Sequence, residues 1–173
     1  MRMPVLGVLL VMCTAAPLSA QSLILPPPPT KVVSLSGPRF GMTVLGQGVV
    51  DALHERSIEV RPNISQFGWQ FEKEFYTKDS GVAAVNEWVV LLGGMEQGVV
   101  LPSVSWLVGL RTRDGAEFGV GPNVTPAGVA LAVAAGVTFR AGALNVPMNV
   151  AFVPSKAGTR VSVLTGFNMR RRR

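Results

Sequence analysis

The single histidine of this 173-residue chain, His54, stands among the kinds of side chain that acyl-transfer chemistry requires. Asp51 and Glu55 are acids that could orient its ring, and Ser57 carries a hydroxyl that its imidazole could activate. A catalytic triad is defined by geometry rather than by closeness in the sequence, so this cluster alone establishes no active site. The simpler interpretation is that His54 is a polar residue on a short amphipathic helix, and we assign no catalytic residue.

A second candidate is a group of glutamates, Glu72, Glu74 and Glu87, that could act as paired carboxylates in glycoside hydrolysis or proton transfer. All three fall on the polar face of predicted strands. If that face lines a narrow barrel, each carboxylate needs a cationic partner, because an unpaired buried charge is costly. Three arginines on the same face are available: Arg111, Arg140 and Arg160. We therefore predict a structural network of ion pairs rather than a catalytic pair.

Metal and cofactor sites have little support in the sequence. The chain has one histidine and one cysteine, Cys13, and it shows no calcium-loop spacing of acidic residues. The glycines of 115–121 do not lead into a predicted helix, as a phosphate-binding loop would require. We expect no metal and no cofactor.

Residues 1–20 have the pattern of a secretory signal peptide. Arg2 supplies the positive end, Val5–Val11 is apolar but too short to span a bilayer as a helix, and the small residues around Ala20 suit signal peptidase. Cys13 would leave with this segment, so the mature chain would have no disulfide. Residues 21–36, with four consecutive prolines, predict an extended linker, and 37–173 the folded domain.

The formal net charge of +6 does not by itself indicate nucleic-acid binding. Four of the positive charges form the tail Arg170–Arg173, and the others are scattered without aromatic interleaving or a helical basic stripe. We expect no nucleic-acid partner and interpret the tail as a solvated segment that can touch anionic lipid headgroups.

From Pro38 onward, large apolar side chains recur at every second residue, which is the period of a β-strand with one apolar face. A short helix is expected within 49–56, where apolar residues have helical spacing. The predicted strands are 39–45, 64–76, 82–92, 99–113, 116–121, 127–140, 143–153 and 159–168.

This pattern predicts an all-β fold, an eight-stranded antiparallel up-and-down β-barrel with a short helix in its first long loop. The strand number is even, as in single-chain bacterial barrels, and the polar face is rich in Gly, Ala and Ser, as a crowded lumen demands. An eight-stranded lumen is filled by side chains, so a pore is not expected. Alternation alone does not exclude a soluble β-sandwich whose apolar face is its core.

The connections between these strands divide into two sets. With the N-terminus in the periplasm, the short connections 77–81, 114–115 and 141–142 would be periplasmic turns. Pro147 falls on a polar face and implies a bulge or an edge position. Aromatic residues such as Trp69, Trp88 and Trp106 are compatible with girdles at the membrane interface. The outer loops would be 46–62, 93–98, 122–126 and 154–158.

Much of the chain, from Ser36 to Asn168, resembles a group of small exported barrel proteins that are described only as outer-membrane proteins of unknown function. The resemblance implies a barrel in the cell envelope, with outer-membrane lipids and the barrel-assembly machinery as partners, and it implies no catalytic residues. One departure is the C-terminus, where Phe167 is the nearest aromatic and six residues follow it. The stretches that carry the resemblance are SGPRFGMTVLG, ISQFGWQFEKEFY, NEWVVLLGGMEQGVVLPSVSWLVGLRTRDGAEFGVGPNVT and GVTFRAGALNVPMNVAFVPSKAGTRVSVLTGFN.

We therefore expect a non-enzymatic outer-membrane protein with transmembrane β-strands, either structural or binding a ligand or partner through its outer loops. Two alternatives stay open. Some eight-stranded barrels modify lipid A with a Ser, a His and an acid near the outer rim, and His54 lies in an expected outer loop. The chain could also be a soluble periplasmic β-domain.

Overall fold

A computed structural model describes residues 35–78, 81–142 and 144–169 of the chain. The expected signal peptide (1–20), most of the expected linker and the arginine tail (170–173) lie outside these residues.

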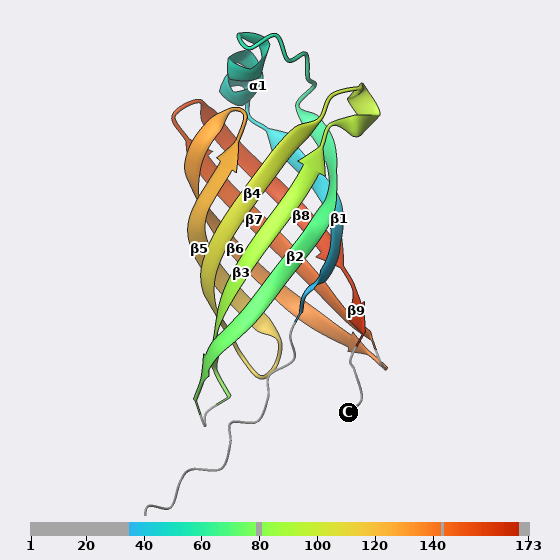
Figure 1. Ribbon diagram of the computed structural model, residues 1–173, viewed down its shortest axis with the longest axis vertical. Helices are drawn as coiled ribbons and strands as arrows, with labels where there is room; N and C mark the ends of the chain where they lie inside the picture. The colour runs from blue at the N-terminus through green and yellow to red at the C-terminus, as the bar shows by residue number, and fades with distance from the viewer. Residues whose placement is uncertain (1–34, 79–80, 143, 170–173) are drawn as a thin grey trace, which may run out of the picture.

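Eight antiparallel strands close into one barrel, as the alternation predicts (Figure 1). Each strand pairs with the next one along the chain, and β1 pairs with β8 to complete the circle. A two-residue strand, β9 (Asn168–Met169), pairs with β7. The eight strands are β1 (Gly37–Leu45), β2 (Asn63–Thr77), β3 (Ala83–Gly93), β4 (Leu101–Arg111), β5 (Ala116–Thr125), β6 (Gly128–Ala141), β7 (Leu144–Ser155) and β8 (Gly158–Gly166).

Closure between β1 and β8 depends on a close approach of the two backbones at Gly41. A Cβ atom on Gly41 would lie 1.9 Å from the carbonyl oxygen of Val163, so a larger residue would force the strands apart. Glycine is therefore required here by space, and it allows the seam of the barrel to pair along its length.

The expected loop at 122–126 is wrong, because β5 continues to Thr125. Alternation persists through this stretch: the Asn123 side chain is buried in the lumen, whereas Val124 is exposed on the outside. Pro122 pairs with Leu131 of β6, whereas the pairing with β4 is interrupted beside it. A proline is tolerated because it removes one donor from one ladder only.

Pro147 lies inside β7, as its inward face suggests, at an interruption of the neighbouring ladder. On one side it pairs with Thr138 of β6. On the other side β8 pairs with β7 from Met148 onward, and β9 pairs with Leu144 and Asn145. On this side neither β8 nor β9 pairs with Pro147, so β7 is locally an edge strand. This confirms the predicted edge position of Pro147.

The two ends of the barrel differ in their connections (Figure 1). The end at which β1 begins and β8 ends carries the connections β2–β3, β4–β5 and β6–β7, and we call it the turn end. The opposite end, the loop end, carries α1 (Gln47–His54) and the 3-10 helix η1 (Met95–Gln97). Helix α1 confirms the short helix expected in the first long loop. Within the described residues, no helix is both long and apolar enough to cross a bilayer.

Large apolar side chains cover the outer face of the barrel, and polar side chains fill much of its lumen. Every strand exposes large apolar side chains on the outward face, most of them valines, leucines, phenylalanines or tryptophans. The buried set includes an unusual number of charged and amide side chains. The buried polar residues are Arg39, Thr43, Gln66, Gln70, Glu87, Arg111, Asn123, Asn145, Arg160 and Asn168.

Exposed aromatic residues lie at several heights on the outer face, both in mid-strand and near the turn end. Trp88 and Trp106 face each other across β3 and β4 in mid-strand, with ring centroids 6.0 Å apart and stacked planes. The indole N–H of Trp106 donates to Asn86. The tryptophans therefore do not mark the strand ends. The residues near the turn end are phenylalanines and a tyrosine: Phe40, Phe75, Tyr76, Phe118, Phe139 and Phe167.

Candidate functional site

A buried ion cluster fills the lumen near the turn end. Its centre is Arg111 on β4, whose guanidinium contacts carboxylates from three other strands. It donates to Glu72 at 2.5 and 2.6 Å, to Glu117 at 2.7 and 3.0 Å, and to Glu87 at 3.3 Å. All four side chains are almost completely buried. One arginine thus ties β2, β3, β4 and β5 together through charge-assisted hydrogen bonds.

Further hydrogen bonds and a second arginine surround this ion cluster. Asn149 of β7 donates to Glu117, and the backbone N–H of Leu35 donates to Glu72 at 3.2 Å. A second cation, Arg39, donates to Gln70 at 2.9 Å and to the Leu35 carbonyl at 2.7 Å. The segment expected to be the end of the linker is therefore already bound to the barrel at Leu35, which is buried. The cluster and this segment fill the turn end.

The predicted network of ion pairs forms around Arg111 with Glu72 and Glu87. Arg140 and Arg160, the other two arginines available on the polar face, form no ion pair among the described residues. Arg140 is next to the end of β6, so its side chain is exposed, and it donates to the Arg113 carbonyl. Arg160 lies near the start of β8, at the loop end. For these two arginines a place on the polar face is therefore not sufficient for pairing with Glu72 or Glu87, because the height along the barrel also has to match.

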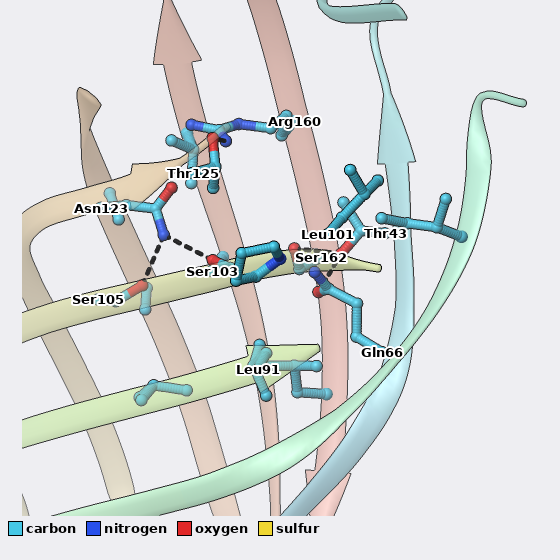
Figure 2. A pocket seen from close by; sticks show the side chains of 18 of the residues that line it. Thr43, Gln66, Leu91, Leu101, Ser103, Ser105, Asn123, Thr125, Arg160 and Ser162 are labelled. Carbon is cyan, nitrogen blue, oxygen red and sulfur yellow. Dashed lines mark hydrogen bonds between the residues drawn. The ribbon is translucent and has the colours of Figure 1, made fainter. Parts of the chain in front are cut away.

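A cavity of about 90 Å³ lies in the lumen between the ion cluster and α1. Its wall is partly apolar, from side chains that include Leu91, Leu101 and Leu107, and partly polar. Figure 2 shows the polar side chains gathered from several strands around this space. The polar residues that line it are Arg39, Thr43, Gln66, Gln70, Glu87, Ser103, Ser105, Asn123, Thr125, Asn149, Arg160 and Ser162.

Most of these polar side chains satisfy one another. The Asn123 amide donates to the hydroxyls of Ser103 and Ser105, both at 2.9 Å. The Thr43 hydroxyl donates to Gln66 at 2.5 Å and lies 2.7 Å from the Ser162 hydroxyl. Such a network holds neutral groups in the lumen without the desolvation cost of orphaned donors.

Two buried arginines line the cavity without an ion pair among the described residues, Arg39 and Arg160. Arg39 donates to Gln70 and to the carbonyls of Pro38 and Leu35, whereas Arg160 has much less compensation. Its side chain is anchored on β8 and donates from Nη1 to the hydroxyl of Thr125 on β5, across the lumen. Its Nε has no hydrogen-bond partner in the part of the chain that the structure describes. The residue is only 6% exposed. The alternation of the sequence predicts that the Arg160 side chain faces the lumen. It does not predict that no described carboxylate pairs with this side chain.

Helix α1 closes the loop end over the cavity. Its buried residues Val49, Val50 and Leu53 pack in one apolar cluster with side chains that include Leu45 and Leu101. Gly46, just before the helix, donates its N–H to the Thr159 carbonyl at 2.8 Å. The helix also passes close to the β7–β8 turn, and Val49 and Leu53 line the cavity. The apolar spacing that predicts the helix thus also predicts its buried face.

His54 is at the end of α1 and half-exposed, and its neighbours do not assemble around it as a triad would. Its Nε2 lies 3.2 Å from the Val60 carbonyl and 3.5 Å from Glu59. Asp51 instead accepts a hydrogen bond from Gln47. Ser57 adopts a left-handed conformation with φ of 61° in the turn that follows the helix.

We expect His54→Ala to leave the lipid A of a producing cell unchanged, because the ring serves local contacts in this turn. The measurement is a mass spectrum of lipid A from cells that express the wild-type chain, the variant or neither. A lipid A modification present with the wild-type chain and lost with His54→Ala would contradict this prediction.

Glu96 in η1 holds the neighbouring strand β2 at the loop end. Its carboxylate accepts hydrogen bonds from the hydroxyl and from the backbone N–H of Ser65. These two bonds, the hydroxyl first, lower the pKa of Glu96 to about 2. Because the folded-state pKa lies below the ordinary value of 4.5, the contact stabilises the loop above that value. This contribution is lost as the pH falls through about 2.

We expect hydrogen exchange at the Ser65 amide to accelerate, relative to other strand amides, as the pH falls from 4.5 towards 2. The same acceleration is expected at any pH in Glu96→Gln, which accepts these bonds more weakly. NMR of the folded barrel, normalised for the intrinsic pH dependence of exchange, measures it. Identical protection in the variant and the wild type would show that the carboxylate does not hold this strand.

Among the described residues, no group of three or more His, Cys, Asp or Glu side chains is arranged to bind a metal ion. Comparisons of the chain with protein-family models, with curated proteins and with solved structures find no match. The barrel, the ion cluster, the cavity and its capping helix are therefore the features from which function can be argued.

Proposed function

We propose that this chain is an outer-membrane β-barrel protein of the cell envelope that performs no catalysis and crosses the bilayer with its eight strands. The observation that carries the proposal is the distribution of polarity in the barrel: the outer face is apolar, whereas the lumen buries charged and amide side chains beside a smaller apolar cluster around Val89, Leu91 and Leu107. Exposed apolar side chains on the outer face include Met42, Phe71, Leu110, Leu131 and Val150. Soluble proteins rarely expose apolar surface that is continuous around the molecule.

The polar lumen supports the same proposal. A water-soluble barrel of eight strands would gain most of its stability from an apolar interior and would keep charges on its surface. Here the arrangement at the turn end is the reverse, with Arg111 and three glutamates inside. Lipid around the outer face would remove the apolar side chains from water, and the closed strand pairing leaves no unpaired edge in the bilayer.

The proposed location implies outer-membrane lipids and the barrel-assembly machinery as partners. Aromatic residues near the turn end, such as Tyr76 and Phe139, would lie at one membrane interface. In this orientation the loop end, with α1 and η1, would face outward from the cell.

The test is extraction of the native envelope fraction with carbonate, followed by electrophoresis of heated and unheated samples. We expect the protein to stay in the membrane pellet and to migrate differently before and after heating, because a folded barrel resists detergent at room temperature. Release into the wash without a mobility shift would overturn the proposal and assign the chain to the soluble periplasmic class.

A further inference from the structure

Arg160 is buried where none of the described carboxylates neutralises it, and this isolation requires an explanation. The cation at the turn end, Arg111, has three carboxylates around it, whereas Arg160 has only the Thr125 hydroxyl at Nη1. Removing an unpaired charge from water is costly unless another group compensates it. A guanidinium has five N–H donors in a planar fork that matches a carboxylate or a phosphate.

The wall around Arg160 narrows the choice of anion. Its partners in the neighbouring strands are Leu45 on β1 and Val153 on β7, and both side chains are buried and line the cavity. Leu101 and Leu53, which belong to the apolar cluster that packs against α1, line the same cavity. An inorganic anion would use the guanidinium alone, whereas a carboxylate with a short alkyl chain would also use this apolar wall.

We propose that the cavity binds a short-chain monocarboxylate, with its carboxylate on Arg160 and its alkyl chain against the apolar wall beneath α1. The size follows from the volume. A cavity of 150 Å³ in another protein accommodates the six non-hydrogen atoms of benzene, so in proportion one of about 90 Å³ suits about four. Acetate and propionate are closest to this size. The inference concerns the lumen and holds whether or not the barrel is inserted in a membrane.

The test is a ligand-observed NMR titration of the full chain, folded in neutral detergent, with sodium propionate at constant ionic strength. We expect saturable binding by the wild-type protein and at least tenfold weaker binding by Arg160→Gln. Arg140→Gln is the matched control, because Arg140 is an exposed arginine near the other end of the barrel, and its propionate affinity should equal that of the wild type. Sodium octanoate should bind at least tenfold more weakly than propionate, because its chain exceeds the cavity.

A second variant separates loss of the ligand from loss of the fold. Ala132 lines the cavity and is buried, so Ala132→Leu should fill the space and weaken propionate binding at least tenfold while Arg160 stays in place. The dispersion of amide resonances in the NMR spectrum reports folding for each variant, whether or not the barrel belongs in a membrane. Absence of propionate binding by folded wild-type protein, or equal binding by folded Arg160→Gln, would overturn the proposal. Equal affinity for phosphate and propionate would overturn the choice of a carboxylate and assign the site to small anions in general.

Discussion

Replacement of Val108 by arginine is expected to destabilise the inserted barrel strongly, if its outer face meets lipid. Val108 lies in the middle of β4, paired with Asn86 and Val120, and its side chain is 45% exposed on the outer face. An arginine on the lipid face near the bilayer centre costs about 2–4 kcal/mol in transmembrane barrels. The expected result is a lower yield of folded protein in lipid vesicles and a lower urea midpoint.

The matched control for this experiment is Val100→Arg. Val100 is 62% exposed, comparable with Val108, but it precedes β4 in the connection at the loop end. In a water-soluble domain both positions would meet water, and both arginines would change stability little. In a membrane barrel only Val108→Arg should be costly. Equal urea midpoints for the two variants in vesicles would therefore argue against a lipid-facing surface, independently of the fractionation experiment.

Replacement of Arg111 by methionine is the second change with a large expected effect. Methionine preserves much of the side-chain volume but leaves Glu72, Glu87 and Glu117 without the cation that they share. Breaking a buried ion pair by removal of one partner typically costs about 3–5 kcal/mol. We expect a destabilisation of at least this size in urea unfolding at neutral pH, and a poor yield of folded barrel.

Arg113→Met provides the control for this prediction, because Arg113 follows β4 and is exposed. Its substitution should change the unfolding free energy by less than about 0.5 kcal/mol, as surface substitutions usually do. Adding Glu72→Gln and Glu117→Gln to Arg111→Met should recover part of the lost stability, because two of the three unpaired buried carboxylates are then replaced by neutral amides. If Arg111→Met unfolds like the wild type, the ion cluster does not stabilise the barrel.

The outline of the barrel was predictable because alternation is a local property of the strand backbone. Successive side chains point to opposite faces, so the apolar set of β8, with Val161 and Val163 outside and Ser162 and Leu164 inside, is visible in the sequence. The end of β5 was not predictable in the same way. Pro122 and Asn123 usually mark turns, and only pairing with β6 keeps them in a strand.

The candidate sites were less predictable than the fold. The inward face of Arg160 follows from its place in the pattern, but its contact with Thr125 joins residues 35 positions apart on strands that are not neighbours. The role of Leu35 was missed for a similar reason, because a residue between a linker and a strand shows no local signal of burial. The cavity also has no signature in the sequence, since it results from how side chains of eight strands fill one lumen.

The sequence by itself determines the strand number, the two faces of each strand, the capping helix and the division of the connections between two ends. These features follow from the spacing of side chains along a short piece of backbone, which local geometry controls. Only the tertiary structure decides which charges meet. Strand tilt and register set the height of each inward side chain, and they bring Arg111 to three glutamates while leaving Arg160 with a hydroxyl.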